Sequence, residues 1–152
     1  MIFFPGELFF PERMRLISNE MNIDEASIAD VLMLYNEALN ASDTEAVMRL
    51  YAEDGVFMPQ GSPSSVGAGA VRAAYERVFA TIRLQVRFDI AEIRQVAGDW
   101  AFARTNSSGT QRVNATGVQT AEGNQELFVM RRVDEQWKIA RYCFSSTNAP
   151  PS

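Results

Sequence analysis

Apolar residues in the first half of the chain follow the three- and four-residue spacing of a single helix face. The first such stretch begins near residues 22–24, where Asn22 and Glu25 have the spacing of a capping box and Asp24 is an alternative N-cap. Ser42 and Glu45 form a second capping box ahead of a short second helix. The two apolar stripes consist of Ile28, Val31, Leu32, Tyr35, Ala38 and Leu39, and then of Ala46, Val47, Leu50 and Tyr51. This pattern predicts a helix hairpin.

The middle of the chain predicts a short strand and a third helix. Residues 52–55 are expected to form a turn, residues 56–58 a brief strand, and residues 60–69 a loop rich in Gly, Ser and Pro. The helical stripe that follows contains Val71, Ala74, Tyr75, Val78, Phe79 and Ile82.

From residue 83 onward the hydrophobic period changes to two, which predicts strands. The phase slips near residues 91–93, and a slip inside a long strand predicts a bulge and a bend. Further strands are expected at 100–106, at about 112–120, and at 126–133 and 137–144, the last two forming a hairpin around Asp134-Glu135. Helices followed by a meander of strands predict an α+β fold.

Composition narrows the possible functions. The 152 residues are 47% hydrophobic with a net charge of −5, which fits one globular domain and argues against nucleic acid as a partner. The chain has no His and a single Cys, Cys143, so it lacks the ligands of common zinc, haem and iron–sulfur sites. It has no Gly-rich phosphate loop, and we expect no cofactor and no metal.

The chain is expected to contain one domain with short flanking segments. Residues 1–21 are taken as an N-terminal extension, residues 22–146 as the domain, and residues 147–152 as a tail. The apolar N-terminus begins without positive charge and is interrupted by Pro5 and Pro11, so it is not typical of a signal peptide. No stretch approaches the roughly 20 apolar residues of a membrane span. A cytoplasmic location without membrane contact is therefore expected.

Several segments, in this order, resemble the NTF2-like superfamily. They are Tyr35 to Asp43 (YNEALNASD), Leu50 to Val56 (LYAEDGV), Gly67 to Tyr75 (GAGAVRAAY), Asn124 to Arg131 (NQELFVMR) and Trp137 to Tyr142 (WKIARY). The last two are similar to the closing strands of its SnoaL-like branch, which includes small proteins of polyketide and enediyne biosynthesis. The resemblance covers about residues 24–145.

The resemblance implies a cone in which three N-terminal helices pack on a strongly curved, mostly antiparallel sheet that encloses a pocket. It also implies a homodimer formed across the sheets. Candidates for apolar residues on that outer face are Val113, Val118, Val129 and Phe144.

The resemblance also implies candidate catalytic residues. Ketosteroid isomerase holds an oxyanion with a tyrosine of the first helix and a late-strand carboxylic acid, and its base is an aspartate of the first strand. Tyr35 corresponds to that tyrosine, and Glu126 lies near the acid. The position of the base falls on Met58 or Pro59, which cannot accept a proton, so the isomerase reaction itself is disfavoured.

Strand alternation suggests which residues complete a substrate site. Arg104 is in register with Trp100 and Phe102, and Arg141 with Trp137 and Ile139, so both arginines are expected to point either inward, where one of them would hold a substrate anion, or into an interface. The alternative is that either arginine forms a buried ion pair with Glu126 that has only a structural role. The other candidate pocket residues are Met58, Tyr75, Phe79 and Trp100, for which the alternative is a place in the core, and Asn106, for which the alternative is the end of a strand.

Two hypotheses remain open from the sequence. In the first, the pocket binds a small, largely apolar organic molecule and Glu126 performs acid/base chemistry of the cyclase, isomerase or dehydratase type. In the second, the protein is a non-catalytic binding or dimer-assembly module.

Overall fold

A computed structural model describes residues 23–148, so the predicted extension 1–21 and the capping residue Asn22 lie outside the described part. The described residues form three helices, α2 (Ile23–Asn40), α3 (Thr44–Leu50) and α4 (Ala68–Thr81). Within residues 23–148, none of the helices has the length and apolar character needed to cross a bilayer.

One six-stranded sheet provides the rest of the fold, with the strand order β2-β1-β6-β5-β4-β3. The parallel pair is β1 with β6, and the other neighbours are antiparallel, which confirms the mostly antiparallel α+β architecture. The helices do not all precede the sheet, because α4 follows β1 and β2. The strands are β1 (Tyr51–Met58), β2 (Ser65–Val66), β3 (Ile82–Ala97), β4 (Trp100–Val113), β5 (Gln119–Val133) and β6 (Gln136–Ser146).

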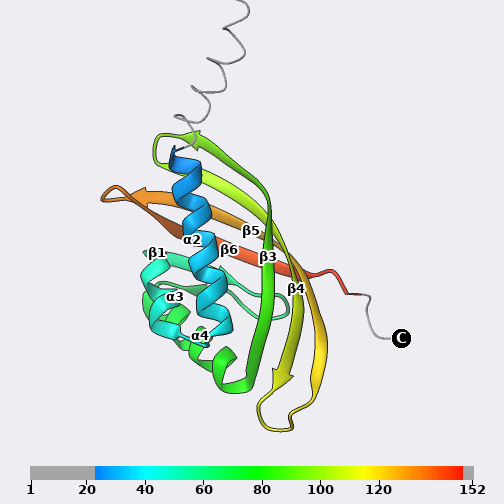
Figure 1. Ribbon diagram of the computed structural model, residues 1–152. Helices are drawn as coiled ribbons and strands as arrows, with labels where there is room; N and C mark the ends of the chain where they lie inside the picture. The colour runs from blue at the N-terminus through cyan, green and yellow to red at the C-terminus, as the bar shows by residue number, and fades with distance from the viewer. Residues whose placement is uncertain (1–22, 149–152) are drawn as a thin grey trace, which may run out of the picture.

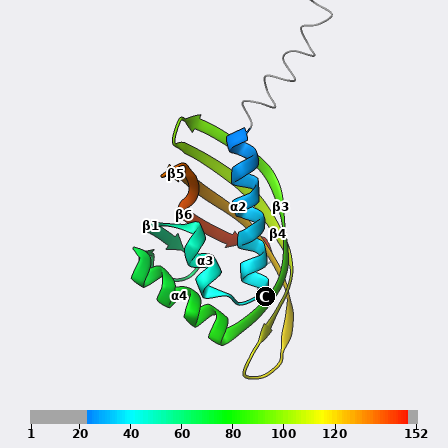
Figure 2. The same ribbon diagram turned by 60° about the vertical axis from the view of Figure 1, so that its left-hand side comes forward.

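The helices lie against the concave face of the curved sheet, and α2 runs along β3 (Figures 1 and 2). Two asparagines of α2 bind the free edge of β3. Asn40 donates to the carbonyl of Val86 and accepts from its amide, and Asn36 joins the same carbonyl to the amide of Phe88. These side chains satisfy backbone groups that an edge strand would otherwise leave unpaired.

Two features allow the sheet to bend around the helices. The register of β3 against β4 shifts between Ile90 and Glu92, which confirms the bulge predicted near residues 91–93. Gly109 faces Val86 across the same strand pair, where a Cβ atom would lie 2.0 Å from the carbonyl oxygen of Gln85. Only glycine permits this approach of the two backbones.

Three local predictions of caps, turns and strands differ from the structure. Asp43, not Ser42, caps α3, and its carboxylate accepts from the amide of Ala46. The segment expected as a turn at 52–55 belongs to β1, because this stretch pairs with β6 through a register shift. There is no separate strand at about 112–120: residues 114–118 form the turn between β4 and β5, and Asn114 in this turn donates to carbonyls at the end of α4. The hairpin at Asp134-Glu135 is confirmed, and both residues have positive φ.

Candidate functional site

A cavity of about 180 Å³ lies between the helices and the concave face of the sheet. Most of its wall is apolar and aromatic, whereas its polar side chains other than tyrosine come from β4 and β5. The apolar lining includes Leu39, Phe57, Val78, Leu84, Val86, Phe88 and Phe144, and the polar side chains of the two strands are Ser107, Gln111, Glu122, Asn124 and Glu126. An apolar enclosure with a few converging polar groups is the usual form of a small-molecule site.

Glu126 is the most buried carboxyl group in this wall, with only 4% of the residue exposed. It points inward because β5 alternates buried and exposed residues from Glu126 to Met130. Thr105, its partner in register on β4, donates to Oε1 at 2.5 Å, and Ser107 donates to Oε2 at 2.5 Å. Burial raises the pKa of Glu126 above its ordinary value of 4.5, although these two hydroxyl groups partly oppose the shift. The nearby Glu122 raises the pKa further.

The inward orientation expected for Arg104 is wrong. Arg104 is exposed on the convex face of the sheet, where its Nε donates to Glu92 at 2.6 Å. The concave side of β4 instead carries Ala101, Ala103, Thr105 and Ser107, all of them buried. The bulky Trp100 and Phe102 share the outer face with Arg104, because small side chains fit beneath the closely packed helices.

Arg141 is also on the outer face, and a bulge is the reason. Met130 pairs with Ile139, but the preceding Val129 pairs with Arg141, so Ala140 is an extra residue in β6. Ile139 and Ala140 are consequently both buried, and the alternation changes phase before Arg141. The guanidinium of Arg141 donates to the carbonyls of Asp54 and Ala140. Neither arginine contacts Glu126, whose polar partners among the described side chains are hydroxyl groups.

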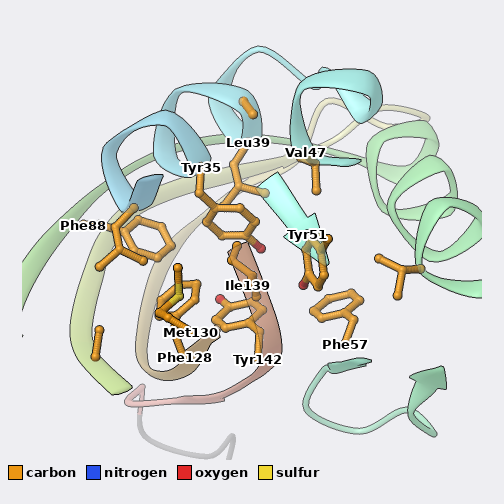
Figure 3. Close-up of a cluster of buried hydrophobic side chains, with 14 of the residues drawn as sticks. Tyr35, Leu39, Val47, Tyr51, Phe57, Phe88, Phe128, Met130, Ile139 and Tyr142 are labelled. Carbon is orange, nitrogen blue, oxygen red and sulfur yellow. The ribbon is translucent and has the colours of Figure 1, made fainter. Parts of the chain in front are cut away.

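The four tyrosines of the chain gather in the core beside the cavity. Figure 3 shows Tyr35 of α2, Tyr51 of β1 and Tyr142 of β6 between the helices and the sheet. The hydroxyl of Tyr75 lies 2.6 Å from that of Tyr35 and 2.7 Å from that of Tyr51. Tyr142 packs edge-on against Tyr35, with ring centroids 5.4 Å apart. Tyr35, Tyr75 and Tyr142 line the cavity that also contains Glu126.

The hydroxyl groups of Tyr35, Tyr51 and Tyr75 carry three protons but share two hydrogen bonds. One proton of the trio is therefore available to donate to another acceptor. When Tyr51 donates to Tyr75 and Tyr75 donates to Tyr35, the free proton is that of Tyr35, at the cavity wall. Burial raises the pKa of each of these tyrosines, so they remain neutral donors at ordinary pH.

The remaining expected pocket residues divide between the two faces. Met58, Trp100 and Asn106 are exposed, and Met58 pairs in register with the half-buried Cys143. Phe79 is half-buried and packs against Tyr75, but it does not line the cavity.

The strand β1 faces the cavity with Phe57 and with the following Pro59, not with Met58. Neither residue can accept a proton, and the two carboxylates of β1, Glu53 and Asp54, are exposed and do not line the cavity. Phe144, expected on the outer face, instead lines the cavity and stacks on Phe57 with ring centroids 6.3 Å apart.

Sequence reasoning missed the residues that hold Glu126. Thr105 and Ser107 alternate with Arg104 and Asn106 along β4. Because the prediction placed Arg104 on the inner face, it placed both hydroxyl groups on the outer face. The run of small side chains at 101, 103, 105 and 107 was the available signal, because such a row fits beneath a closely packed helix.

Comparison with known proteins agrees with this architecture. The family model for the SnoaL-like domain matches residues 32–142. The structure of a ketosteroid isomerase-like protein from Erwinia carotovora atroseptica is 37% identical and superposes with a TM-score of 0.81, covering 84% of this chain and 99% of that one.

Two other structures share the fold at lower identity. A candidate scytalone dehydratase from Novosphingobium aromaticivorans is 18% identical with a TM-score of 0.75, covering 86% of this chain and 89% of that one. An NTF-2 like protein of unknown function from Shewanella oneidensis is 19% identical with a TM-score of 0.67, covering 81% of this chain and 99% of that one. On the family match and the 37% identity, the chain belongs to the SnoaL-like domain family within the NTF2-like fold.

Proposed function

We propose that this protein binds a small, largely apolar organic molecule in the cavity and that Glu126 exchanges a proton with it. The observation that carries this proposal is the environment of Glu126. The carboxyl group is buried in a cavity wall, has no basic partner within residues 23–148, and is oriented by two hydroxyl donors. A carboxyl group with a raised pKa can hold or release a proton closer to neutral pH than a solvated one.

The unused hydrogen-bonding capacity of the site suggests a reaction class. A carboxylate offers about four acceptor positions, and Thr105 and Ser107 occupy one on each oxygen. The tyrosine trio supplies one spare donor at the same cavity. A base and a neutral donor together suit a carbonyl compound that loses a proton from the adjacent carbon while its oxygen gains charge. The names of the ketosteroid isomerase-like and dehydratase-like relatives are consistent with such proton transfer.

The absence of a proton acceptor at Phe57 and Pro59 limits this proposal. A reaction that needs a cavity-facing base on β1 is disfavoured, and we propose Glu126 as the group that both accepts and donates the proton. Arg104 and Arg141 have no part in it, because both lie on the opposite face of the sheet.

Hydrogen–deuterium exchange provides a direct test that needs no known substrate. A panel of small aromatic and cyclic ketones is incubated with the protein in D₂O, and loss of the proton next to the carbonyl is followed by NMR. We expect accelerated exchange for some members and a fall of roughly 100-fold or more in Glu126→Gln. Glu92→Gln is the matched control, since that glutamate is on the outer face.

Native mass spectrometry of the purified protein tests binding separately. We expect wild type to retain a small molecule that Glu126→Gln or Tyr35→Phe loses, while Glu92→Gln keeps it. An empty protein that remains unchanged by these substitutions and catalyses no exchange would contradict the proposal.

A second candidate function is dimer assembly without catalysis, favoured by the apolar residues of the outer face. Trp100 and Leu127 are each 42% exposed there, and Phe102 and Val129 are paired in register between them. We propose that a second copy of the chain covers this surface. A dimer in the same native spectra that dissociates in Leu127→Glu would support it, and a monomer in wild type would contradict it.

A further inference from the structure

A second hollow, here called the vestibule, adjoins the cavity. Its volume is about 600 Å³, and it shares with the cavity the walls formed by Phe57, Pro59, Val78, Ile82 and Phe144. The remainder of its lining comes from the loop before β2 and from one face of α4.

The charge of the vestibule is opposite to that of the cavity. Among the described residues, the vestibule contains one charged side chain, Arg77, together with the hydroxyl groups of loop serines and Thr81. The described lining of the cavity contains two carboxyl groups, Glu122 and Glu126, and no basic side chain. A ligand that extends through both spaces therefore meets a positive end and an acidic end.

Arg77 is an exposed residue on the side of α4 that lines the vestibule. It shares the vestibule-facing side of α4 with Ala74, Val78 and Thr81, which follow the three- and four-residue spacing of one helix face. The hydroxyl of Thr81 donates to the carbonyl of Arg77 at 2.8 Å. Arg77 forms no ion pair within residues 23–148, although five other arginines there do.

We propose that the vestibule binds an anionic group, a carboxylate or a phosphate, at one end of the ligand, and that Arg77 is the residue that recognises it. A guanidinium matches the paired oxygens of either anion. The cavity is mainly apolar and its described lining offers no cation to an anion, so the ligand enters with its neutral, apolar end toward Glu126. This inference rests on the proposed binding function and adds the orientation and chemical class of the ligand.

Three probes with one ring system test this inference by calorimetric or fluorescence titration. They are 1-naphthylacetamide, 1-naphthylacetate and 1-naphthyl phosphate, which share the apolar part and differ in charge. We expect wild type to bind at least one anionic probe more tightly than the neutral one. Arg77→Gln should weaken that anion about three- to fivefold, the effect of a partly exposed ion pair, and leave the amide unchanged.

Two control variants separate charge from shape. Arg83→Gln removes an exposed arginine that lines neither space and should change none of the affinities. Arg77→Lys should keep the affinity for phosphate better than that for a carboxylate held by both nitrogens, which identifies the source of the anion.

The outcomes distinguish this inference from the proposed function. Equal binding of all three probes, or an equal loss of all three in Arg77→Gln, would overturn the role of Arg77 while leaving the apolar cavity intact. If none of the probes binds wild type, the proposed function fails, and the anion site fails with it.

Discussion

Glu126 and Glu92 lie on opposite faces of one sheet, and their pKa values are shifted in opposite directions. Glu126 is buried on the concave face, bound by the hydroxyl groups of Thr105 and Ser107, and its pKa is raised by burial. Glu92 lies on the convex face in an ion pair with Arg104, and its pKa is lowered by that guanidinium. On the concave face the carboxyl group accepts hydrogen bonds from neutral hydroxyl groups inside an apolar enclosure. On the convex face it pairs with a positively charged side chain at the solvent-exposed surface.

This difference in pKa is the reason that proton transfer is proposed for Glu126 on the concave face and not for Glu92 on the convex face. A carboxyl group beside arginine is held in its charged form and exchanges protons poorly near neutral pH. A buried carboxyl group with hydroxyl partners can exist in either form, which a general acid or base requires.

The largest expected difference between the two faces is in how much an apolar side chain contributes to the free energy of unfolding. Phe128 is fully buried and stacks on Tyr142 with ring centroids 4.3 Å apart, while its neighbour Leu127 is 42% exposed on the other side of β5. We predict that Phe128→Ala lowers the free energy of unfolding by about 3–5 kcal/mol, measured by urea denaturation. Leu127→Ala should cost less than about 1 kcal/mol at low protein concentration. A larger cost that grows with concentration would indicate that a second copy covers the outer face.

A smaller effect is expected within the tyrosine cluster. Tyr75 makes both hydroxyl hydrogen bonds of the trio, whereas Tyr35 makes one of them. We predict that Tyr75→Phe costs about 1–3 kcal/mol of unfolding free energy, and that Tyr35→Phe costs about 1 kcal/mol. Equal costs in thermal or urea unfolding would contradict the central position of Tyr75.

The smallest effect, but the most specific, is the sign of the pH dependence. Between 4.5 and its raised pKa, Glu126 stays protonated in the folded state after it has ionised in the unfolded one. Stability contributed by this group is therefore lost as pH rises through that window, and Glu126→Gln should gain stability relative to wild type as pH rises above 4.5.

Glu92 should give the opposite sign. Its lowered pKa contributes stability above 4.5 that disappears as pH falls, so Glu92→Gln should match wild type only in acid. Urea titrations at each pH measure both differences, and slopes of the same sign would contradict the contrast between the two faces.

The fold was predictable because local pattern and tertiary structure agree over long segments. The stripe of α2 places Ile28, Leu32 and Tyr35 in the core, and the phase slip in β3 marks the bend of the sheet. The buried position of Glu126 on a late strand also followed from the resemblance. Its catalytic role remains a proposal.

The direction of the arginines could not be predicted from alternation alone. In β4, the choice between faces depends on which side of the sheet the helices cover, and local sequence does not encode this. In β6, the extra residue Ala140 changes the phase between Ile139 and Arg141, and a bulge of this kind depends on pairing with β5. For these two reasons Glu126 accepts hydrogen bonds from Thr105 and Ser107, and not from an arginine as the sequence suggested.

Carbon-detected NMR titration of the glutamate side-chain carboxyl groups tests the central claim most directly. Selective ¹³C labelling, with Glu126→Gln and Glu92→Gln to assign the two signals, gives both pKa values in one protein. We predict that Glu126 titrates above 4.5 and that Glu92 titrates below it. A Glu126 signal that titrates at or below 4.5 would contradict the account, because that carboxyl group would then be a solvated or charge-paired anion without the environment of an acid/base residue.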